Sequence, residues 1–305
     1  MKTIGAPSKY IEGEYIQPPH TACPGCGMPL AMRYVLKAIG AKIVLVIPPS
    51  CASIVGYSPK RIFVYQGENI LGLSTPLGSA AAHASGLKIA LVTRGDTETE
   101  VVVFAGDGAT FDIGLGGLSG VAGRNEDILY VCYDNESYGN TGGQTSSATP
   151  WGARTASNLP PSAQMEYKKD IISIMAAHRI PYLATATIAY PDDLMRKAKK
   201  AKEVTGFRFL HILSPCVAGW LYRSELTVKI ARRAVETRLF PLLEVENGTK
   251  YTINKEPAGL PVAEYLRLQG RYQHLTEADI AAFQVMVDEN WRRLMWVASY
   301  GDNEK

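Results

Sequence analysis

The sequence predicts an α/β protein whose mostly parallel sheet is covered by helices on both faces and followed by a C-terminal extension. Short runs of β-branched residues recur between helical stretches, which is the pattern of a sheet built from strand–helix–strand crossovers. Helices normally cover both faces of such a sheet. With 305 residues and 46% hydrophobic content, the chain can also bury a large core.

The expected strands follow one another along the chain. A charged amphipathic helix near residues 192–204 separates the last two, and its basic residues are expected to form a solvated face. The strands are IVLVI at 43–47, RIFVY at 61–65, EVVVFAG from 100, ILYVCYDN at 128–135, PYLATATI from 181 and FRFLHILSP from 207.

Two long loops rich in Gly, Ser and Thr, at 66–79 and 135–165, are expected to carry function because ordinary connections are shorter. Residues 242–257 are expected to form a hairpin or an extended arm. A helix follows over 276–299, which Thr276 can cap. The simplest division is one domain over residues 1–240 and a C-terminal arm and helix over 241–305.

Charge and cysteine content exclude several classes of protein. The formal net charge is +3, from 32 basic and 29 acidic residues, which gives no reason to expect a nucleic-acid partner. We find neither an apolar signal-peptide core nor a membrane-span candidate, so we expect a cytoplasmic protein. Five cysteines are an odd number, which favours metal binding or catalysis over a disulfide framework.

Polar residues follow two of the expected strands directly. The strand from residue 100 runs into Gly106, Asp107 and Gly108, where backbone N–H groups could approach a phosphate. Asn135 and the carbonyl of Ser137 follow the next strand, 28 residues after Asp107, as expected for neighbouring strand ends. One carboxylate with amide and carbonyl oxygens suits a hard divalent ion beside a diphosphate.

Four cysteines are flanked by Pro, Gly or Ser, as befits turns that present thiolates. Cys23 and Cys26 form a C-x-x-C pair, and Cys51 and Cys216 lie further along the chain. Four thiolates can hold either zinc or a [4Fe–4S] cluster, and spacing alone does not choose between them. Cys132, in the middle of an apolar strand, is expected to be inert packing.

The segments GDGATFDIGLGGLSG and YDNESYGNTGGQ together resemble the thiamine-diphosphate motif of the pyruvate:ferredoxin oxidoreductase family, over roughly residues 20–240. The resemblance implies a thiamine-diphosphate-binding fold for residues 1–240. It implies that Mg²⁺ is held by Asp107, Asn135 and the Ser137 carbonyl, and that Asn140 lies close to the reacting carbon. The implied cofactor contacts are Gly106, Asp107, Gly108, Asn135, Ser137, Asn140, Thr141, Cys51 and Ala52.

The same resemblance assigns Cys23, Cys26, Cys51 and Cys216 to a [4Fe–4S] cluster beside the thiamine diphosphate. It implies the beta subunit of an enzyme that decarboxylates a 2-oxoacid, with pyruvate as first choice. Coenzyme A accepts the acyl group and ferredoxin the electrons. The implied partners are a pyrimidine-binding alpha subunit that supplies a glutamate, a gamma subunit and a ferredoxin-like delta subunit, or their equivalents.

Three alternatives remain open at this stage. The substrate could be oxalate or a branched-chain 2-oxoacid instead of pyruvate. The chain could be a non-redox thiamine-diphosphate enzyme with a structural zinc site. It could also be a zinc-stabilised α/β binding module without activity, although that would leave the Gly106–Gly108 turn unused.

Overall fold

The computed structural model describes residues 15–16, 20–56, 64–65, 68–160, 163 and 165–301. Within these residues, eight strands form one sheet in the order β10-β9-β7-β8-β6-β5-β1-β4. Six of them run parallel to their neighbours, which confirms the α/β prediction. The strands are β1 (Ile43–Ile47), β4 (Leu71–Ser74), β5 (Glu100–Gly106), β6 (Leu129–Asp134), β7 (Tyr182–Thr187), β8 (Arg208–Leu213), β9 (Leu243–Glu246) and β10 (Lys250–Ile253).

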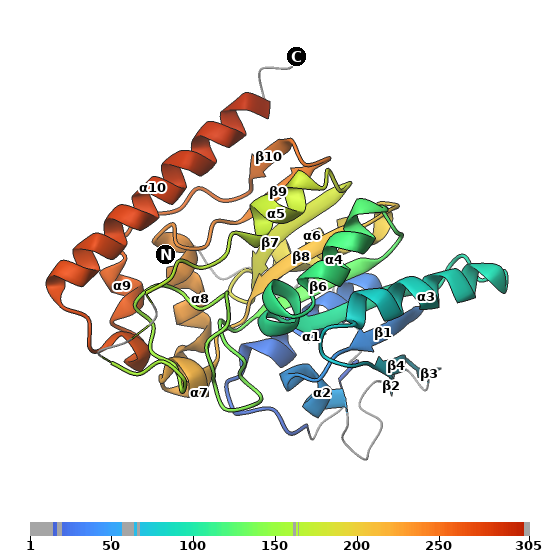
Figure 1. The fold of residues 1–305 in the computed structure, drawn as a ribbon, viewed down its shortest axis with the longest axis horizontal. Helices are drawn as coiled ribbons and strands as arrows, with labels where there is room; N and C mark the ends of the chain where they lie inside the picture. The colour runs from blue at the N-terminus through green and yellow to red at the C-terminus, as the bar shows by residue number, and fades with distance from the viewer. Residues whose placement is uncertain are drawn as a thin grey trace.

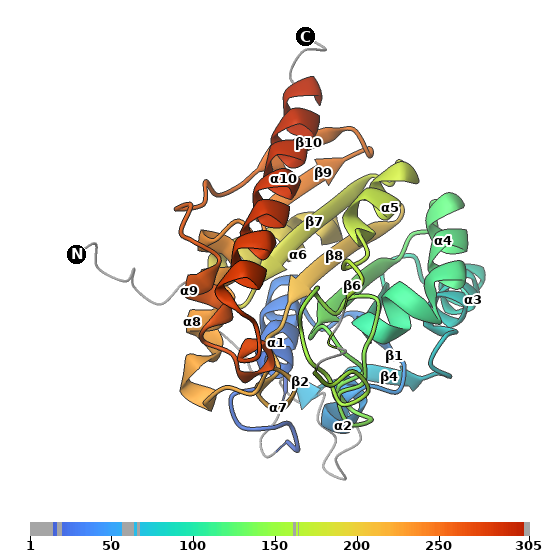
Figure 2. The same cartoon turned by 60° about the vertical axis from the view of Figure 1, so that its left-hand side comes forward.

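Helices cover both faces of this sheet (Figures 1 and 2). On one face α1 (Gly27–Ile39) and α6 (Pro191–Glu203) pack against the sheet. On the other lie α3 (Ala80–Thr93), α4 (Leu115–Gly123) and α5 (Ile171–Ala177). Strand β5 supplies both cores, because side chains of successive strand residues point to opposite faces. This explains why its sequence is apolar at successive positions.

A third apolar cluster joins the C-terminal part to the ends of the strands. It includes Trp220, Tyr265, Phe283 and Val287. The elements around it are α7 (Val217–Trp220), α8 (Thr227–Glu236), α9 (Ala263–Leu266), the short turns η2 (Ser224–Leu226) and η3 (Gly270–Tyr272), and the long helix α10 (Glu277–Gly301). Figure 1 shows α10 crossing one side of the molecule and ending beyond β10.

The expected strand at 61–65 does not join the sheet where the structure describes it. Residues 61–63 lie outside the described part of the chain. Val64–Tyr65 (β2) pairs antiparallel with Glu68–Asn69 (β3), away from the main sheet. The edge strand is instead β4, inside the expected loop 66–79, and it pairs parallel with β1. Its sequence, LGLS, contains a glycine and too few β-branched residues to predict a strand.

The C-terminal segment begins with a hairpin, as expected, and this hairpin continues the main sheet. Strand β9 pairs antiparallel with β7, and β10 pairs with β9. The expected start of α10 is confirmed, because Thr276 and Asp279 exchange hydrogen bonds between their side chains and backbone N–H groups.

The prediction that the basic residues of α6 form a solvated face is wrong for Lys197. That side chain is fully buried, and its Nζ donates to Asp193 at 2.7 Å and to the Thr185 carbonyl at 2.8 Å. Lys200 lies over β9, where it pairs with Glu244 and Glu246. The helical spacing was correct, but carboxylates 44 residues away could not be placed from the helix alone.

No helix in the described part of the chain has the length and apolar character needed to cross a membrane.

Candidate functional site

The candidate site lies at the carboxyl ends of the parallel strands β1, β5 and β6. A cavity of about 100 Å³ opens there. Ala52 is buried nearby, and its N–H donates to the Tyr133 hydroxyl at 3.2 Å. Most of the residues predicted from the sequence line this cavity: Cys51, Gly106, Asp107, Gly108, Asn135, Ser137, Asn140 and Thr141.

Three oxygen-bearing groups meet at one point of this edge. One atom of the Asn135 amide lies 2.6 Å from the Ser137 carbonyl oxygen and 2.9 Å from Asp107 Oδ1. With no cation present, hydrogen bonding favours the amide nitrogen in that place. With a divalent cation bound, the amide would turn so that its oxygen occupies that place and faces the cation. A carboxylate, an amide and a backbone carbonyl so close together fit a Mg²⁺ site.

Asp107 is fully buried and is held from two further directions. Its Oδ2 accepts a 2.5 Å hydrogen bond from Ser146 Oγ, and its Oδ1 accepts one from the Asn135 N–H at 3.3 Å. Burial, followed by the nearby charge of Asp134, raises the pKa of Asp107 well above its usual value. An ionised carboxylate in this place therefore calls for a positive partner, as a divalent cation would be.

The two glycines of the turn also lie close to tyrosine side chains. A Cβ on Gly108 would lie 2.2 Å from the ring of Tyr138, and one on Gly106 would lie 3.2 Å from the Tyr133 hydroxyl. The Tyr138 hydroxyl also donates to the Gly108 carbonyl at 3.3 Å. Gly108 thus makes room for a tyrosine from the next strand end. The chain then continues through a π-helical turn, η1 (Gly108–Asp112), a feature often found at functional sites.

The four cysteines predicted to act together lie at the same end of the sheet. The turn containing Cys23 and Cys26 packs on the segment before Cys216, because the Gly27 N–H donates to the Pro215 carbonyl at 3.1 Å. Cys51 begins α2 (Cys51–Gly56), directly after β1. Burial, and then the three other cysteines, raise the pKa of Cys51 to about 12. Burial likewise raises the pKa of Cys26 to about 11.

Their geometry bears on the choice between zinc and a larger cluster. A zinc ion bonded at about 2.3 Å to four sulfurs would need those sulfurs about 4 Å apart. Among the described residues, no three His, Cys, Asp or Glu side chains are gathered closely enough to hold a metal ion. Those residues therefore do not already form a zinc site, and four thiolates suit either a zinc ion or a [4Fe–4S] cluster by their chemistry. Cys132 is buried in β6, apart from this set, in agreement with a packing role.

Ser137 and Gly139 lie between the oxygen triad and the cysteines. Ser137 Oγ is buried and has no hydrogen-bond partner among the described residues. A Cβ on Gly219 would lie 3.4 Å from Cys216 Sγ and 3.5 Å from Ser137 Oγ. A Cβ on Gly139 would lie 2.9 Å from the Asn135 amide and 3.5 Å from Cys51 Sγ. The oxygen triad and the thiols are therefore adjacent.

Behind the triad lies a network of buried charges that the sequence did not reveal. Burial alone would raise the pKa of Asp134, but Lys168 and His211 lower it to about 2. Lys168 Nζ lies 2.5 Å from Asp134 and 2.8 Å from Glu136. Arg271, in η3, pairs with Glu136 at 2.6 Å. Two buried carboxylates beside Asn135 signal a need for cationic partners, but the sequence does not say which residues supply them.

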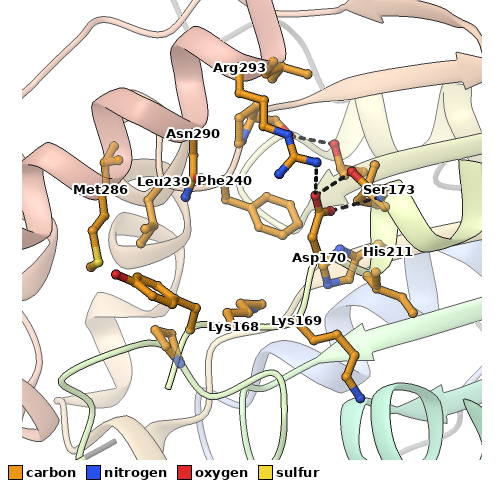
Figure 3. A pocket seen from close by; sticks show the side chains of 18 of the residues that line it. Lys168, Lys169, Asp170, Ser173, His211, Leu239, Phe240, Met286, Asn290 and Arg293 are labelled. Carbon is orange, nitrogen blue, oxygen red and sulfur yellow. Dashed lines mark hydrogen bonds and ion pairs between the residues drawn. The ribbon is translucent and has the colours of Figure 1, made fainter. Parts of the chain in front are cut away.

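A larger cavity of about 570 Å³ lies elsewhere, between α10, the loop before α5 and the ends of β8 and β9. Figure 3 shows Phe240, Met286 and Arg293 around it, with Lys168 at its floor. Of the residues beside the triad, Glu136 reaches this cavity, but none of the predicted ligands does. We take the smaller cavity as the candidate site, because the predicted cofactor ligands line that one.

Comparisons with known proteins agree with this geometry. The model of the thiamine pyrophosphate enzyme family, C-terminal TPP binding domain, matches residues 52–212. Ketoisovalerate oxidoreductase subunit VorB of Pyrococcus abyssi is 46% identical over 293 residues, which cover 92% of each chain. Pyruvate synthase subunit PorB of Methanocaldococcus jannaschii is 42% identical over 292 residues, covering 92% of this chain and 96% of the relative.

A solved structure extends the comparison to the fold. The 2-oxoglutarate:ferredoxin oxidoreductase from Magnetococcus marinus matches with a TM-score of 0.59 and 24% identity, covering 88% of this chain and 94% of the other. At this identity the likeness concerns the fold alone. The relatives and the matching domain show that the chain belongs to the 2-oxoacid:ferredoxin oxidoreductase family, as a thiamine-diphosphate-binding beta subunit.

Proposed function

We propose that this subunit serves an enzyme that oxidatively decarboxylates a small 2-oxoacid, passes the acyl group to coenzyme A and delivers two electrons to ferredoxin. The observation that supports this most directly is the adjacency of the oxygen triad and the four thiols. Cys51 connects the two, because it is one of the four cysteines and lines the small cavity with Asp107. Electron transfer from substrate to cluster needs such proximity.

In this proposal Asp107, Asn135 and the Ser137 carbonyl would hold Mg²⁺, which would neutralise the charge of the cofactor's diphosphate. Ser146 keeps the Asp107 carboxylate oriented through its 2.5 Å hydrogen bond. Asn140 and Thr141 line the outer part of the cavity and would contact the cofactor beyond its diphosphate. Thiamine diphosphate, when bound, supplies the electron sink for loss of CO₂. The protein contributes position and electrostatics.

Cys23, Cys26, Cys51 and Cys216 would hold one [4Fe–4S] cluster. The thiols must lose their protons to bind iron, which a cationic cluster core favours despite their burial. Further clusters would belong to a ferredoxin-like subunit, since the four thiols account for one cluster only. A structural zinc ion at these cysteines is the alternative that the experiment below excludes or supports.

Partner subunits are part of the proposal, and the surface at the β4 edge supports one of them. Helix α3 is apolar, yet only Ala80, Ala81 and Ala84 of its residues are buried. Ile89 is 62% exposed and Val92 48% exposed, while Leu71 on the edge strand is 63% exposed. Figure 1 shows α3 and β4 on the same side of the molecule. Such apolar surfaces mark protein contacts, and we assign this one to the pyrimidine-binding subunit.

The names of the relatives point to two different substrates. One relative is named a ketoisovalerate oxidoreductase subunit and another a pyruvate synthase subunit, at 46% and 42% identity. We therefore place pyruvate and branched-chain 2-oxoacids together as candidates.

The test is made on the anaerobically purified chain with its co-purifying subunits. We expect iron and sulfide, a broad brown absorption, and bleaching of that absorption by one 2-oxoacid together with coenzyme A. Comparison of kcat/KM for pyruvate and 2-oxoisovalerate would name the preferred substrate. A colourless protein that contains zinc would refute the electron-transfer role.

A further inference from the structure

The segment that carries the proposed Mg²⁺ ligands has an unfavourable backbone conformation at its centre. Glu136, between Asn135 and Ser137, has a φ of +62°. Left-handed conformations of this kind cost a non-glycine residue free energy and persist where the surroundings hold them. In this place the conformation lets the Asn135 side chain and the Ser137 carbonyl face the same point.

The contacts that hold Glu136 come from three directions. Its carbonyl accepts a 2.8 Å hydrogen bond from Thr149 Oγ1. Its carboxylate pairs with Lys168 at 2.8 Å and with Arg271 at 2.6 Å. Both the Glu136 and the Arg271 side chains are almost fully buried, so this pair is screened little by water.

Arg271 also fixes the neighbouring residue through an aromatic side chain. Its guanidinium lies 4.0 Å from the centre of the Trp220 ring, and the Trp220 Nε1–H donates to the Asn135 carbonyl at 2.8 Å. Trp220 ends α7, the short helix that follows Cys216. The Arg271 guanidinium therefore contacts both Glu136, which lies between two residues of the oxygen triad, and Trp220, which lies in the segment that carries Cys216.

The backbone around Arg271 packs closely against neighbouring segments, which fixes the position of Arg271. The Gly270 N–H donates to the Leu221 carbonyl at 2.9 Å, and a Cβ on Gly270 would lie 2.8 Å from Leu221 Cβ. The Arg271 carbonyl accepts the Arg154 N–H at 3.1 Å. The Arg271 side chain also donates from Nε to Gln269 and from Nη2 to the Tyr265 hydroxyl.

We propose that Arg271 is a positioning residue for the Mg²⁺–diphosphate site, holding Asn135 and Ser137 through Glu136 and Trp220. The C-terminal extension thereby takes part in cofactor binding without contacting the cofactor. The inference rests on the proposed function, because it takes Asn135 and Ser137 as Mg²⁺ ligands.

The experiment compares Arg271→Met and Arg271→Lys in the assembled enzyme. Thiamine diphosphate and Mg²⁺ are removed with a chelator, and their rebinding is measured by calorimetry, with the melting temperature recorded in parallel. Residues that orient metal ligands typically change metal affinity by about 10- to 100-fold. We expect a loss in this range for Arg271→Met. Arg271→Lys should recover part of it, because lysine keeps the charge but not the planar stacking on Trp220.

A matched control lies four residues earlier in the chain. Arg267 is 63% exposed and pairs with Glu277 at 2.8 Å, so Arg267→Met makes the same substitution at an exposed arginine–glutamate pair outside the network. Its Mg²⁺ and cofactor affinities should stay within about twofold of the unmodified enzyme. If Arg271→Met melts at a lower temperature but rebinds Mg²⁺ and cofactor with unchanged affinity, Arg271 is only structural and the inference fails.

If Arg271→Met does not fold, Trp220→Phe provides a second test of the inference. It removes only the indole N–H that Asn135 receives and leaves a ring for the guanidinium, so we expect about a fivefold loss of affinity, the equivalent of one hydrogen bond. An unchanged affinity in this variant would also overturn the inference. If the unmodified enzyme itself binds no thiamine diphosphate, the proposed function fails, which is distinguishable from either result.

Discussion

At the scale of single residues, the candidate site contains two kinds of residue. The predicted ligands can be recognised in the sequence, whereas the residues that hold them in place cannot. Asp107 and Asn135 directly follow strands, so their approach to each other follows from the parallel order of β5 and β6. Their separate functions can be tested by removing one ligand at a time.

Asp107→Ala removes the only carboxylate of the oxygen triad. We expect thiamine diphosphate and Mg²⁺ retention to fall at least about 100-fold, because a divalent ion loses its charged ligand. Iron content should remain near that of the unmodified enzyme, since Asp107 is not a proposed cluster ligand. Cofactor analysis after desalting, with iron analysis of the same sample, checks both. Equal loss of both cofactors would point to unfolding and contradict the two-site arrangement.

Gly108→Ala tests whether this glycine makes room for Tyr138. The added Cβ would lie 2.2 Å from the Tyr138 ring, so the ring must move, and we expect a destabilisation of about 1–3 kcal/mol with weaker cofactor retention. Gly116→Ala is the matched control, because nothing lies within 4 Å of its Cβ and alanine favours the helix. Chemical denaturation measures both. An equal stability change in the two variants would contradict the packing argument.

How much of the site the sequence predicts depends on how locally each residue is determined. The convergence of the predicted ligands at one cavity could be predicted because strand-end residues are set by short patterns of apolar and polar residues. Lys168 and Arg271 could not, because they reach Glu136 from 32 and 135 residues away. Burial of Lys197 and the pairing of β4 with β1 were missed for the same reason. Long-range contacts decided both, against weak local propensity.

At the scale of elements, α6 is joined to strand β9 through Glu244. This carboxylate accepts hydrogen bonds from Tyr182 at 2.7 Å, from Lys200 at 2.9 Å and from Arg196 at 2.9 Å. Burial alone would raise its pKa from 4.5, but these three donors outweigh burial and lower it to about 2. The ion pairs therefore link the hairpin to the body of the sheet.

A depressed pKa in the folded state gives a definite pH dependence. The stabilisation by ionised Glu244 is present above pH 4.5, its unfolded value, and is lost as the pH falls toward about 2. Glu244→Gln should lower the free energy of unfolding by about 1–3 kcal/mol at pH 7 and flatten its decline below pH 5. Denaturation series at several pH values measure this. Glu225→Gln, at an exposed ion pair with Arg223, serves as control and should change neither.

At the scale of the whole molecule, apolar surface is distributed unevenly. The sheet is covered on both faces, and the C-terminal elements close one end of it. The β4 edge is different, because an apolar helix and an edge strand there leave large side chains exposed. Edge strands and apolar patches of this kind are normally covered by another chain. This asymmetry fits a subunit that completes its site on association.

Ile89→Glu tests that assignment, because it places a charge in the middle of the exposed face of α3. We expect the variant to fold, since Ile89 is 62% exposed, but to lose its partner subunits during purification. Thiamine diphosphate retention should fall with the partner, whereas iron bound to the four cysteines should remain. Val228→Glu, at a 40% exposed position of α8, is the matched control and should leave the assembly intact. Size-exclusion chromatography with cofactor analysis distinguishes the cases. If Ile89→Glu co-purifies with all partners in full amount, the pyrimidine-binding subunit docks elsewhere, and the exposed apolar face of α3 needs another explanation.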